Sequence, residues 1–387
     1  MNSRTKNFIY NVITFAVTIG LVVLAAMLAV KTTDYDNPDR FIVVLFFICG
    51  AIASAILHVV VHELGHVIAG KRNGFVLLSV RFFCFEFKKV NGKTKFCFSL
   101  NLSTAGETVM VPKGTENMKK RYARLAGGGI IASTVLALIG VAGMAVVSYL
   151  PLVGFAFTSM VLPITAYNLL SNALPMSEGG VMNDGAVVDG ARRNTDSVIV
   201  SAKMLQLEAE LYSGKSYKDV DPDLLFDLPQ LPEDDFTFVV LLTNRYSYYL
   251  DKEDYENALK VSGRIYSLLD KLSKPAQREL KKNLLYDACA VKLNEEEADD
   301  LTAELEKTLN KDDSATGLRI KASYLLYVLK DYDTAEKFIK RGLKLADKEQ
   351  IKGIGLFEKS LLEKMKKDLP TEKAVEGEKT AENGITE

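Results

Sequence analysis

The sequence predicts a mainly α-helical protein in two parts, a polytopic membrane part followed by a soluble helical part. Of the 387 residues, 48% are hydrophobic although 25% are charged, so the two kinds of residue must gather in different regions. Residues 1–190 hold 16 Lys or Arg and 10 Asp or Glu, a net charge of +6. Residues 191–387 hold 32 Lys or Arg and 39 Asp or Glu, a net charge of -7. The chain has 26 glycines and four cysteines, too few for a collagen-like or a disulfide-scaffold protein. We interpret all four cysteines as ordinary apolar residues.

Four apolar runs account for the membrane part. A helix rises about 1.5 Å per residue, so about 20 apolar residues cross the roughly 30 Å hydrocarbon layer. The first run is longer than the core of a secretory signal, which is about 7–15 residues, so we expect it to be retained as a helix. The predicted transmembrane helices cover 8–30, 41–70, 125–150 and 152–174, with Pro151 between the last two.

The charges of the connecting loops predict how these helices are oriented. Residues 71–124 carry 12 Lys or Arg and three acidic residues, whereas residues 31–40 carry two basic and three acidic residues. Basic short loops stay in the cytoplasm. We therefore expect a multi-pass protein of the cell membrane, with the N-terminus, the basic loop and everything after about residue 175 in the cytoplasm.

The second apolar run ends in an H-E-x-x-H motif. His62 and His66 are four residues apart, so on a helix they share one face and can hold one zinc ion. Glu63 lies beside them and, not being a ligand itself, can act as the base that activates water. An ionisable residue inside a transmembrane helix is costly and is a candidate functional residue for that reason.

All three histidines of the chain lie on this one helix, which argues against a chance cluster of polar residues at its end. His58 lies one turn further into the membrane and about 40° around the helix from His62, so we do not expect it to be a ligand. It can support a ligand, gate the entry of substrate or pack as a polar residue.

With this motif, residues 41–190 resemble the site-2 protease family of intramembrane zinc metalloproteases. That family takes a third zinc ligand, an Asp, from an N-x-x-P…D-G motif near a later transmembrane helix. The matching residues are Asn172, Pro175, Asp184 and Gly185. The resemblance implies that Asp184 is the third ligand, that Asn172 and Pro175 shape an unwound helix end beside the site, and that Gly185 permits a tight turn.

The chain departs from the family pattern in the spacing before this Asp. Residues 176–183 insert additional positions between Pro175 and Asp184. Because three protein ligands are expected around a catalytic zinc, Asp189 and Glu178 are the other carboxylates that can complete the set.

The basic loop predicts a β-hairpin insert within residues 75–111. Aromatic residues alternate on both sides of Asn91-Gly92, which is typical of a type I′ turn. Site-2 proteases have a β-rich, membrane-associated loop at the corresponding place. The hairpin edge can hold an extended substrate by β-augmentation, or its phenylalanines can simply pack against lipid headgroups.

The soluble part, residues 191–369, carries two similar segments. Each has an aromatic helix and a short acidic turn, followed by Tyr-[Asp/Glu]-x-Ala at Tyr255 and, 77 residues later, at Tyr332. These segments resemble tetratricopeptide repeats, whose period is about 34 residues. We expect a helical, repeat-like domain that offers a surface to a peptide or partner protein, or else a plain helical bundle. Residues 370–387 are rich in Glu, Lys, Thr and Gly and should be disordered.

The function we expect is that of a zinc metalloendopeptidase with one Zn²⁺ per chain, acting on membrane-spanning or membrane-associated proteins or peptides. Such an enzyme releases a signal, a pheromone-like peptide or a membrane-bound regulator. The alternative is an inactive membrane scaffold or receptor that acts through its helical domain. A zinc transporter is disfavoured because the ligands are not spread over several transmembrane helices, and nothing indicates a nucleic-acid partner.

Overall fold

The computed structural model describes residues 3–32, 40–90, 93–98, 104–233 and 235–370. The expected turn at Asn91-Gly92, and the expected disordered tail from residue 371 onward, lie outside the described residues. The chain divides into two compact units, Met1–Gln206 and Leu207–Glu387. The division falls within helix α6 (Asp196–Ser213), whereas the sequence suggested a boundary near residue 190.

Within the described residues, the first unit contains four helices that are long and apolar enough to cross a membrane. Their apolar segments are 22 to 32 residues long, which at about 1.5 Å per residue spans the hydrocarbon layer. Large apolar side chains such as Phe8 and Ile131, 68% and 67% exposed, point outward along them, as a lipid-facing surface requires. The helices are α1 (Ser3–Thr32), α2 (Arg40–Arg72), α3 (Met118–Val146), which continues in η1 (Val147–Tyr149), and α4 (Leu152–Ala173).

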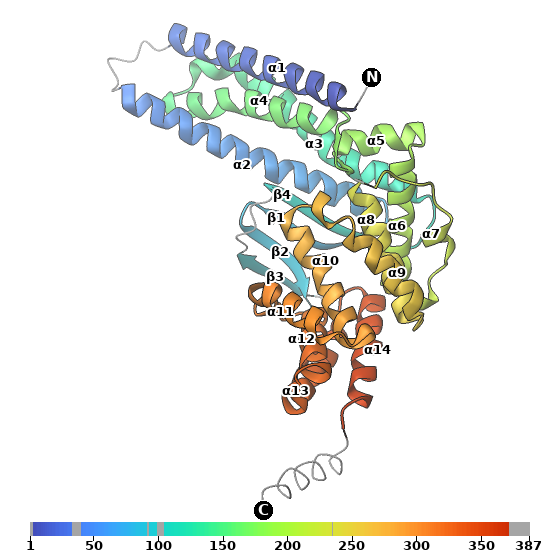
Figure 1. Ribbon diagram of the computed structural model, residues 1–387. Helices are drawn as coiled ribbons and strands as arrows, with labels where there is room; N and C mark the ends of the chain where they lie inside the picture. The colour runs from blue at the N-terminus through green and yellow to red at the C-terminus, as the bar shows by residue number, and fades with distance from the viewer. Residues whose placement is uncertain (1–2, 33–39, 91–92, 99–103, 234, 371–387) are drawn as a thin grey trace, which may run out of the picture. The chain divides into compact units, whose positions relative to one another are not determined.

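These helices lie side by side (Figure 1), with α2 packed against α3 and α4, and α1 packed against α4. Small residues allow α2 and α3 to approach closely. A Cβ atom added at Gly128 would lie 2.5 Å from the Gly65 carbonyl oxygen and 2.5 Å from Cβ of Ala69. Close packing through such small residues is a usual way for apolar helices to associate in a membrane.

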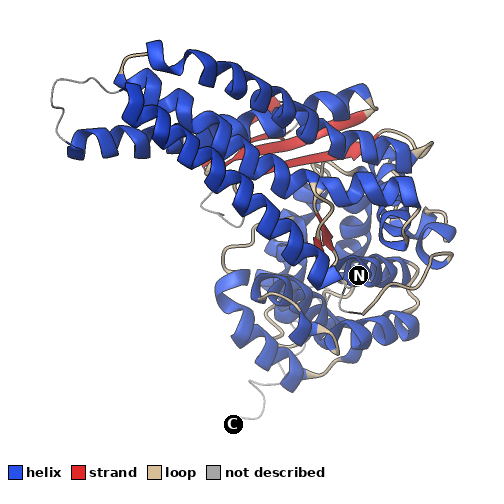
Figure 2. Ribbon diagram, turned by 90° about the horizontal axis from the view of Figure 1, so that it is seen from above, coloured by secondary structure: helices blue, strands red, loops and turns tan. Residues whose placement is uncertain are grey.

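Between α2 and α3 the described residues form a four-stranded antiparallel sheet, where the sequence predicted a hairpin. The strands are β1 (Phe75–Phe82), β2 (Phe85–Val90), β3 (Lys93–Phe98) and β4 (Gly106–Pro112). Their order is β3-β2-β1-β4, so β3 and β4 are the edges. Strands β1 and β4 pack against α2, and Figure 2 shows the strands running beside the long helices.

Strands β2 and β3 form the hairpin that the sequence predicted, and it has one aromatic face. Phe85 pairs with Phe98, and Phe87 with Phe96. Because side chains alternate along a strand, all four rings lie on one face, and they are 38% to 63% exposed. Lysines pair on the other face, Lys88 with Lys95.

The second unit is helical, and its main elements form three successive pairs followed by one last helix. The pairs are α8 with α9, α10 with α11, and α12 with α13, and α14 packs against α13 and α12. The bounds are η2 (Tyr217–Asp219), α7 (Asp223–Phe226), α8 (Phe236–Asp251), α9 (Tyr255–Tyr266), η3 (Leu269–Lys271), α10 (Lys274–Asp287), the π-helical turn η4 (Ala288–Lys292), α11 (Glu295–Leu309), α12 (Ala315–Tyr327), α13 (Tyr332–Ala346) and α14 (Lys352–Lys367).

The same turn precedes the second helix of each pair. A residue with left-handed backbone, φ between 53° and 56°, comes first, at Glu253, Leu293 and Lys330. An Asx residue follows, at Asp254, Asn294 and Asp331, and its side chain accepts a hydrogen bond from the backbone N–H three residues later. Such a cap satisfies one of the free N–H groups at a helix start.

This common turn explains why the two similar segments lie so far apart in the sequence. Tyr255 and Tyr332 begin the second helices of the first and third pairs, and Glu295 occupies the same position in the pair between them. The alanine three residues on is fully buried in all three, at Ala258, Ala298 and Ala335. Whether these pairs are tetratricopeptide repeats stays a prediction.

Candidate metal centre

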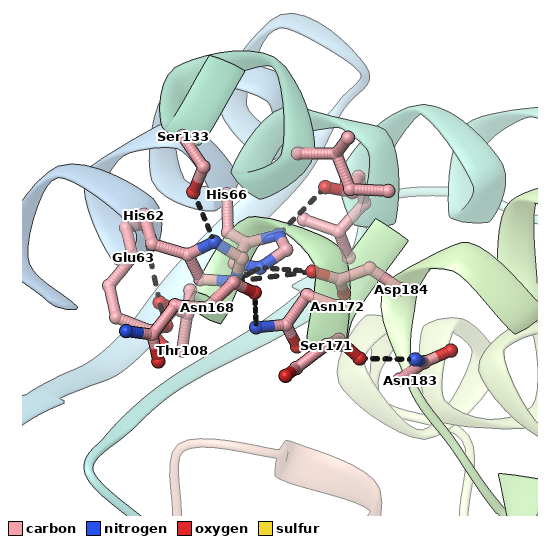
Figure 3. Close-up of polar contacts among 12 residues, drawn as sticks. His62, Glu63, His66, Thr108, Ser133, Asn168, Ser171, Asn172, Asn183 and Asp184 are labelled. Carbon is pink, nitrogen blue, oxygen red and sulfur yellow. Dashed lines mark hydrogen bonds and ion pairs between the residues drawn. The ribbon is translucent and has the colours of Figure 1, made fainter. Parts of the chain in front are cut away.

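Helix α2 brings the polar residues of the H-E-x-x-H motif onto one buried face. His62 and Glu63 are 7% and 8% exposed, and His66 lies one turn on. Figure 3 shows the two imidazole rings side by side, directed toward Asp184 from another part of the chain. The spacing of His62 and His66 in the sequence therefore brings their side chains together in the structure.

Asp184 reaches the cluster because the inserted residues fold back on themselves. They form a small hairpin, β5 (Ser177–Glu178) and β6 (Val181–Met182), and α5 (Asp184–Arg193) begins directly after it. The Asn183 side chain donates to the carbonyls of Ser171 and Leu174, 2.7 Å each, and accepts from Ala186 N at 2.9 Å. Asn183 thus ties the end of α4 to the start of α5, and the insertion does not move Asp184 away.

Three ligand atoms form a nearly equilateral triangle. His62 Nε2 and His66 Nε2 are 3.1 Å apart, and each lies 3.2 Å from Asp184 Oδ2. Metal–ligand distances of about 2.0–2.1 Å place neighbouring ligands of a tetrahedral zinc about 3.3 Å apart. The three side chains therefore fit one tetrahedral face around a zinc ion and leave the fourth position open.

The partners of the imidazoles are consistent with this assignment. His66 Nδ1 lies 2.9 Å from the carbonyl oxygen of Leu125, which can only accept, so Nδ1 carries a proton and Nε2 is the nitrogen through which the neutral ring would bind a metal. His62 Nδ1 lies 2.9 Å from Ser133 Oγ. Asp184 Oδ2 is buried and accepts no well-formed hydrogen bond within the described residues. An ion at the centre would satisfy all three atoms.

Two glycines leave space for these side chains. A Cβ atom at Gly129 would lie 2.5 Å from His66 Nε2 and 2.6 Å from His62 Cε1. At Gly106, the first residue of β4, it would lie 2.4 Å from Glu63 Oε1. Any larger residue at either position would push against the imidazoles or the carboxylate.

The Glu63 carboxylate is held by β4. Thr108 Oγ1 donates to Glu63 Oε2 at 2.6 Å (Figure 3). Glu63, the two histidines and Asp184 line a cavity of about 320 Å³, together with Thr108 and parts of α3, α4 and α5. The carboxylate therefore shares one small cavity with the ligand triangle.

The charge state of Asp184 also suits a ligand. Burial acts to raise the pKa of Asp184, but the neighbouring His62 and His66 outweigh it and hold the pKa below its ordinary value. The carboxylate is anionic, the form that binds metal. The other two carboxylates considered from the sequence lie elsewhere: Asp189 pairs with Arg192 and Arg193 at 3.1 and 2.9 Å, and Glu178 is exposed in β5.

The remaining residues singled out from the sequence lie around the triangle. His58 is 2% exposed and stacks on His62, with ring centroids 5.8 Å apart, but it is outside the ligand set. Asn172 lines the cavity and donates to Asn168 O. Pro175 follows the extended end of α4, and Gly185 packs so tightly that a Cβ atom would lie 2.1 Å from the Ala173 carbonyl.

Sequence reasoning missed Thr108, Ser133 and Gly129, which hold or accommodate the motif residues. Each comes from a segment distant in the sequence and belongs to no recognisable spacing. One weak signal was present: Gly127-Gly128-Gly129 is an unusual run for a helix interior, because glycine is about 1 kcal/mol less favourable there than alanine.

Comparison of the chain with known protein families, with curated proteins and with solved structures gives no match.

Proposed function

We propose that the chain is a membrane-embedded zinc metalloendopeptidase that hydrolyses peptide bonds of membrane-spanning or membrane-associated proteins. The observation that carries this proposal is the ligand triangle of His62, His66 and Asp184, with Glu63 in the same cavity. The triangle lies at the ends of helices that are long and apolar enough to cross a membrane. A water-dependent reaction at such a place suits a substrate that is itself in or near the bilayer.

His62, His66 and Asp184 would hold a zinc ion, which would supply a Lewis acid able to lower the pKa of water to about 7. Glu63 has the position of the general base. Its neighbour Thr108 donates to Oε2, which fixes the carboxylate, and Gly106 leaves room for Oε1. Glu63 would take a proton from the attacking water and give it to the leaving amine.

Strand β4 suggests how the peptide is presented. An intact helix hides its amide carbonyls in hydrogen bonds, so the substrate has to be extended at the bond that is cut. β4 is an edge of the sheet, and its residues Gly106 and Thr108 contact Glu63. Within the described residues β4 pairs only with β1. A substrate strand that adds to the free edge of β4 would be held open beside the catalytic carboxylate.

The loop charges support a location of this chemistry at the cytoplasmic face. His66 lies fewer than two helical turns from Lys71 and Arg72, the basic end of α2. A basic loop stays in the cytoplasm, so we propose that both termini and the helical unit are cytoplasmic. The aromatic face of β2 and β3, flanked by lysines, would then contact the lipid headgroups of that leaflet.

The test compares the wild-type chain with Glu63→Gln. The amide keeps the size of the side chain but cannot take up the proton, so we expect unchanged zinc content and loss of cleavage. Comparative membrane proteomics of cells carrying either form should reveal a small single-span protein that accumulates with the variant. Undiminished proteolysis in Glu63→Gln would refute the mechanism, and a wild-type chain that binds zinc but cleaves nothing would favour a scaffold.

A further inference from the structure

The helical unit contains a groove that the proposed proteolysis does not use. It has a volume of about 660 Å³ and lies between α9 and the first half of α11, with α10 beneath it. Helix α10 packs against both of its neighbours, and Figure 1 draws it between them. Helices α9 and α11 are the second members of the first two helix pairs. The volume is in the range of about 300–1,000 Å³ that is usual for binding sites.

The groove has an apolar floor and an apolar rim. Leu259, Leu284 and Leu301 line the floor. We define the rim as Tyr266, which lines the groove, and Leu293, which lies next to lining residues in the sequence; they are 63% and 66% exposed. Leu293 lies between two residues that line the groove, Lys292 and Asn294. Exposed large apolar side chains around an apolar hollow are typical of an interaction surface.

The other two helix pairs show that this rim is not required by the fold. Leu293 holds the left-handed position of the common turn, where the first and third pairs have the charged residues Glu253 and Lys330. The backbone there does not demand a leucine, since glycine or asparagine suit a left-handed residue better. The fold therefore gives no reason for an exposed leucine at this position.

Gly263 adds a second local departure in the same groove. It lies inside α9, where glycine is about 1 kcal/mol less favourable than alanine, yet a Cβ atom there would meet nothing within 4 Å. Neither packing nor backbone conformation requires glycine. Its effect is to widen the groove, and the π-helical turn η4 (Ala288–Lys292), a kind of turn frequent at functional sites, borders the same space.

The charge of the groove is negative. Its lining includes four carboxylates and two lysines, and both lysines are already paired, Lys281 with Glu304 at 2.5 Å and Lys292 with Glu297 at 2.8 Å. Glu296 and Asp300 are exposed, and among the described residues none forms an ion pair with either. An occupant with Lys or Arg beside apolar residues would meet both the free carboxylates and the apolar floor.

We propose that this groove binds the basic cytoplasmic flank of a membrane-spanning substrate. Cytoplasmic segments next to transmembrane helices are rich in Lys and Arg, and they adjoin apolar residues, which is the combination that the groove complements. The proposal rests on the proposed function for the identity of the occupant. The helical unit would then select substrates by their flank, while the membrane unit cuts them.

The experiment measures fluorescence anisotropy of a short labelled peptide of Leu, Ala and Lys, titrated with the full chain in neutral detergent. A second peptide has glutamate in place of each lysine. The chain carries Glu63→Gln throughout, so binding is read without cleavage. We expect saturable binding of the lysine peptide, weaker binding at higher salt, and no saturable binding of the glutamate peptide.

Two groove variants and one matched control locate the site. Asp300→Lys reverses a free carboxylate and should weaken binding about tenfold. Gly263→Leu fills the groove with a good helix former and should weaken it to a similar extent. Glu306→Lys makes the same charge change on α11 outside the groove lining and should leave binding unchanged.

Helical content and the thermal transition, followed by circular dichroism, show that each variant is folded. If Gly263→Leu does not fold, the comparison of Asp300→Lys with Glu306→Lys still tests the proposal. Equal binding by all variants, or equal binding of the two peptides, would overturn the proposal. That result is separable from a failure of the protease proposal, because peptide binding requires neither zinc nor cleavage.

Discussion

Both units contain carboxylates with buried oxygen atoms, and the partners of these oxygen atoms differ. In the helical unit Glu358, 3% exposed, accepts from Arg319 Nε at 2.7 Å, and Asp287, fully buried, accepts from the hydroxyls of Tyr246 and Ser262 at 2.7 and 2.5 Å. In the first unit Asp184 Oδ2 faces two imidazole nitrogens and accepts no well-formed hydrogen bond within the described residues.

This difference separates a structural polar cluster from a candidate site. A buried carboxylate that accepts from N–H or O–H donors is satisfied by the protein alone. A carboxylate that faces two imidazole nitrogens has instead the arrangement that binds a metal cation. The first arrangement should respond to mutation through stability, and the second through metal binding.

The largest effect should come from His66→Ala. Losing one of three ligands should lower zinc affinity by at least about a hundredfold and abolish cleavage. The free energy of unfolding of the helical unit should not change. Zinc content by mass spectrometry, together with urea unfolding, tests this prediction, and a variant that retains full zinc would show that the triangle is not the site.

The converse substitution is Arg319→Met, which leaves Glu358 buried without its cationic partner. Breaking a buried ion pair in this way costs about 3–5 kcal/mol, so α12 and α14 should exchange amide hydrogens much faster. Zinc content should be unchanged. The double variant with Glu358→Leu should recover much of the loss, and a single variant as stable as wild type would contradict this reading of the pair.

The stability of the helical unit should depend on pH through Asp287. Burial raises the pKa of Asp287 to about 6, although hydrogen bonds from Ser262 and Tyr246 act to lower it. The folded chain therefore keeps a proton that the unfolded chain, with a pKa of about 3.9, has lost. This contribution is fully present below about pH 4 and is lost as the pH rises through about 6, by about 1–3 kcal/mol.

Asp287→Asn should remove this slope from a series of urea unfolding curves between acid and neutral pH. Asp333→Asn, a change at an exposed position of α13, serves as the control and should leave the slope in place. An identical slope in Asp287→Asn and wild type would assign the pH dependence to another group.

The smallest effect concerns two buried serines. Ser133 Oγ lies 2.9 Å from His62 Nδ1 and orients the ring, so Ser133→Ala should weaken zinc binding about tenfold. Ser323, equally buried, donates to Ile320 O of its own helix, and Ser323→Ala should leave zinc binding unchanged. Competition with a chelator of known affinity measures both, and equal affinities would deny Ser133 its positioning role.

The sequence predicts a feature well where its signal is periodic. His62 and His66 follow the helical repeat, and the four apolar helices follow from length and composition. The hairpin of β2 and β3 follows from the alternation of aromatic residues. Strand β4 joins the sheet on the far side of β1, and no local sequence pattern predicts this pairing. Thr108 on that strand was missed for the same reason.

The helical unit shows the same limit. The turn before α9 and α13 could be recognised in the sequence because Tyr255 and Tyr332 share a motif. The turn before α11 could not, because Glu295 stands where the other two have tyrosine. Backbone conformation and a buried alanine, rather than the tyrosine, are what the three turns share. The 77 residues between Tyr255 and Tyr332 therefore span two helix pairs.

The central claim is that two imidazoles and one carboxylate hold a single zinc ion beside Glu63. X-ray absorption at the zinc edge, on the purified Glu63→Gln chain, tests it most directly. The account predicts one zinc per chain with two imidazole nitrogens and oxygen ligands at about 2.0–2.1 Å, as in wild type. Sulfur in the coordination sphere, a different number of imidazoles, or a chain without zinc would contradict it.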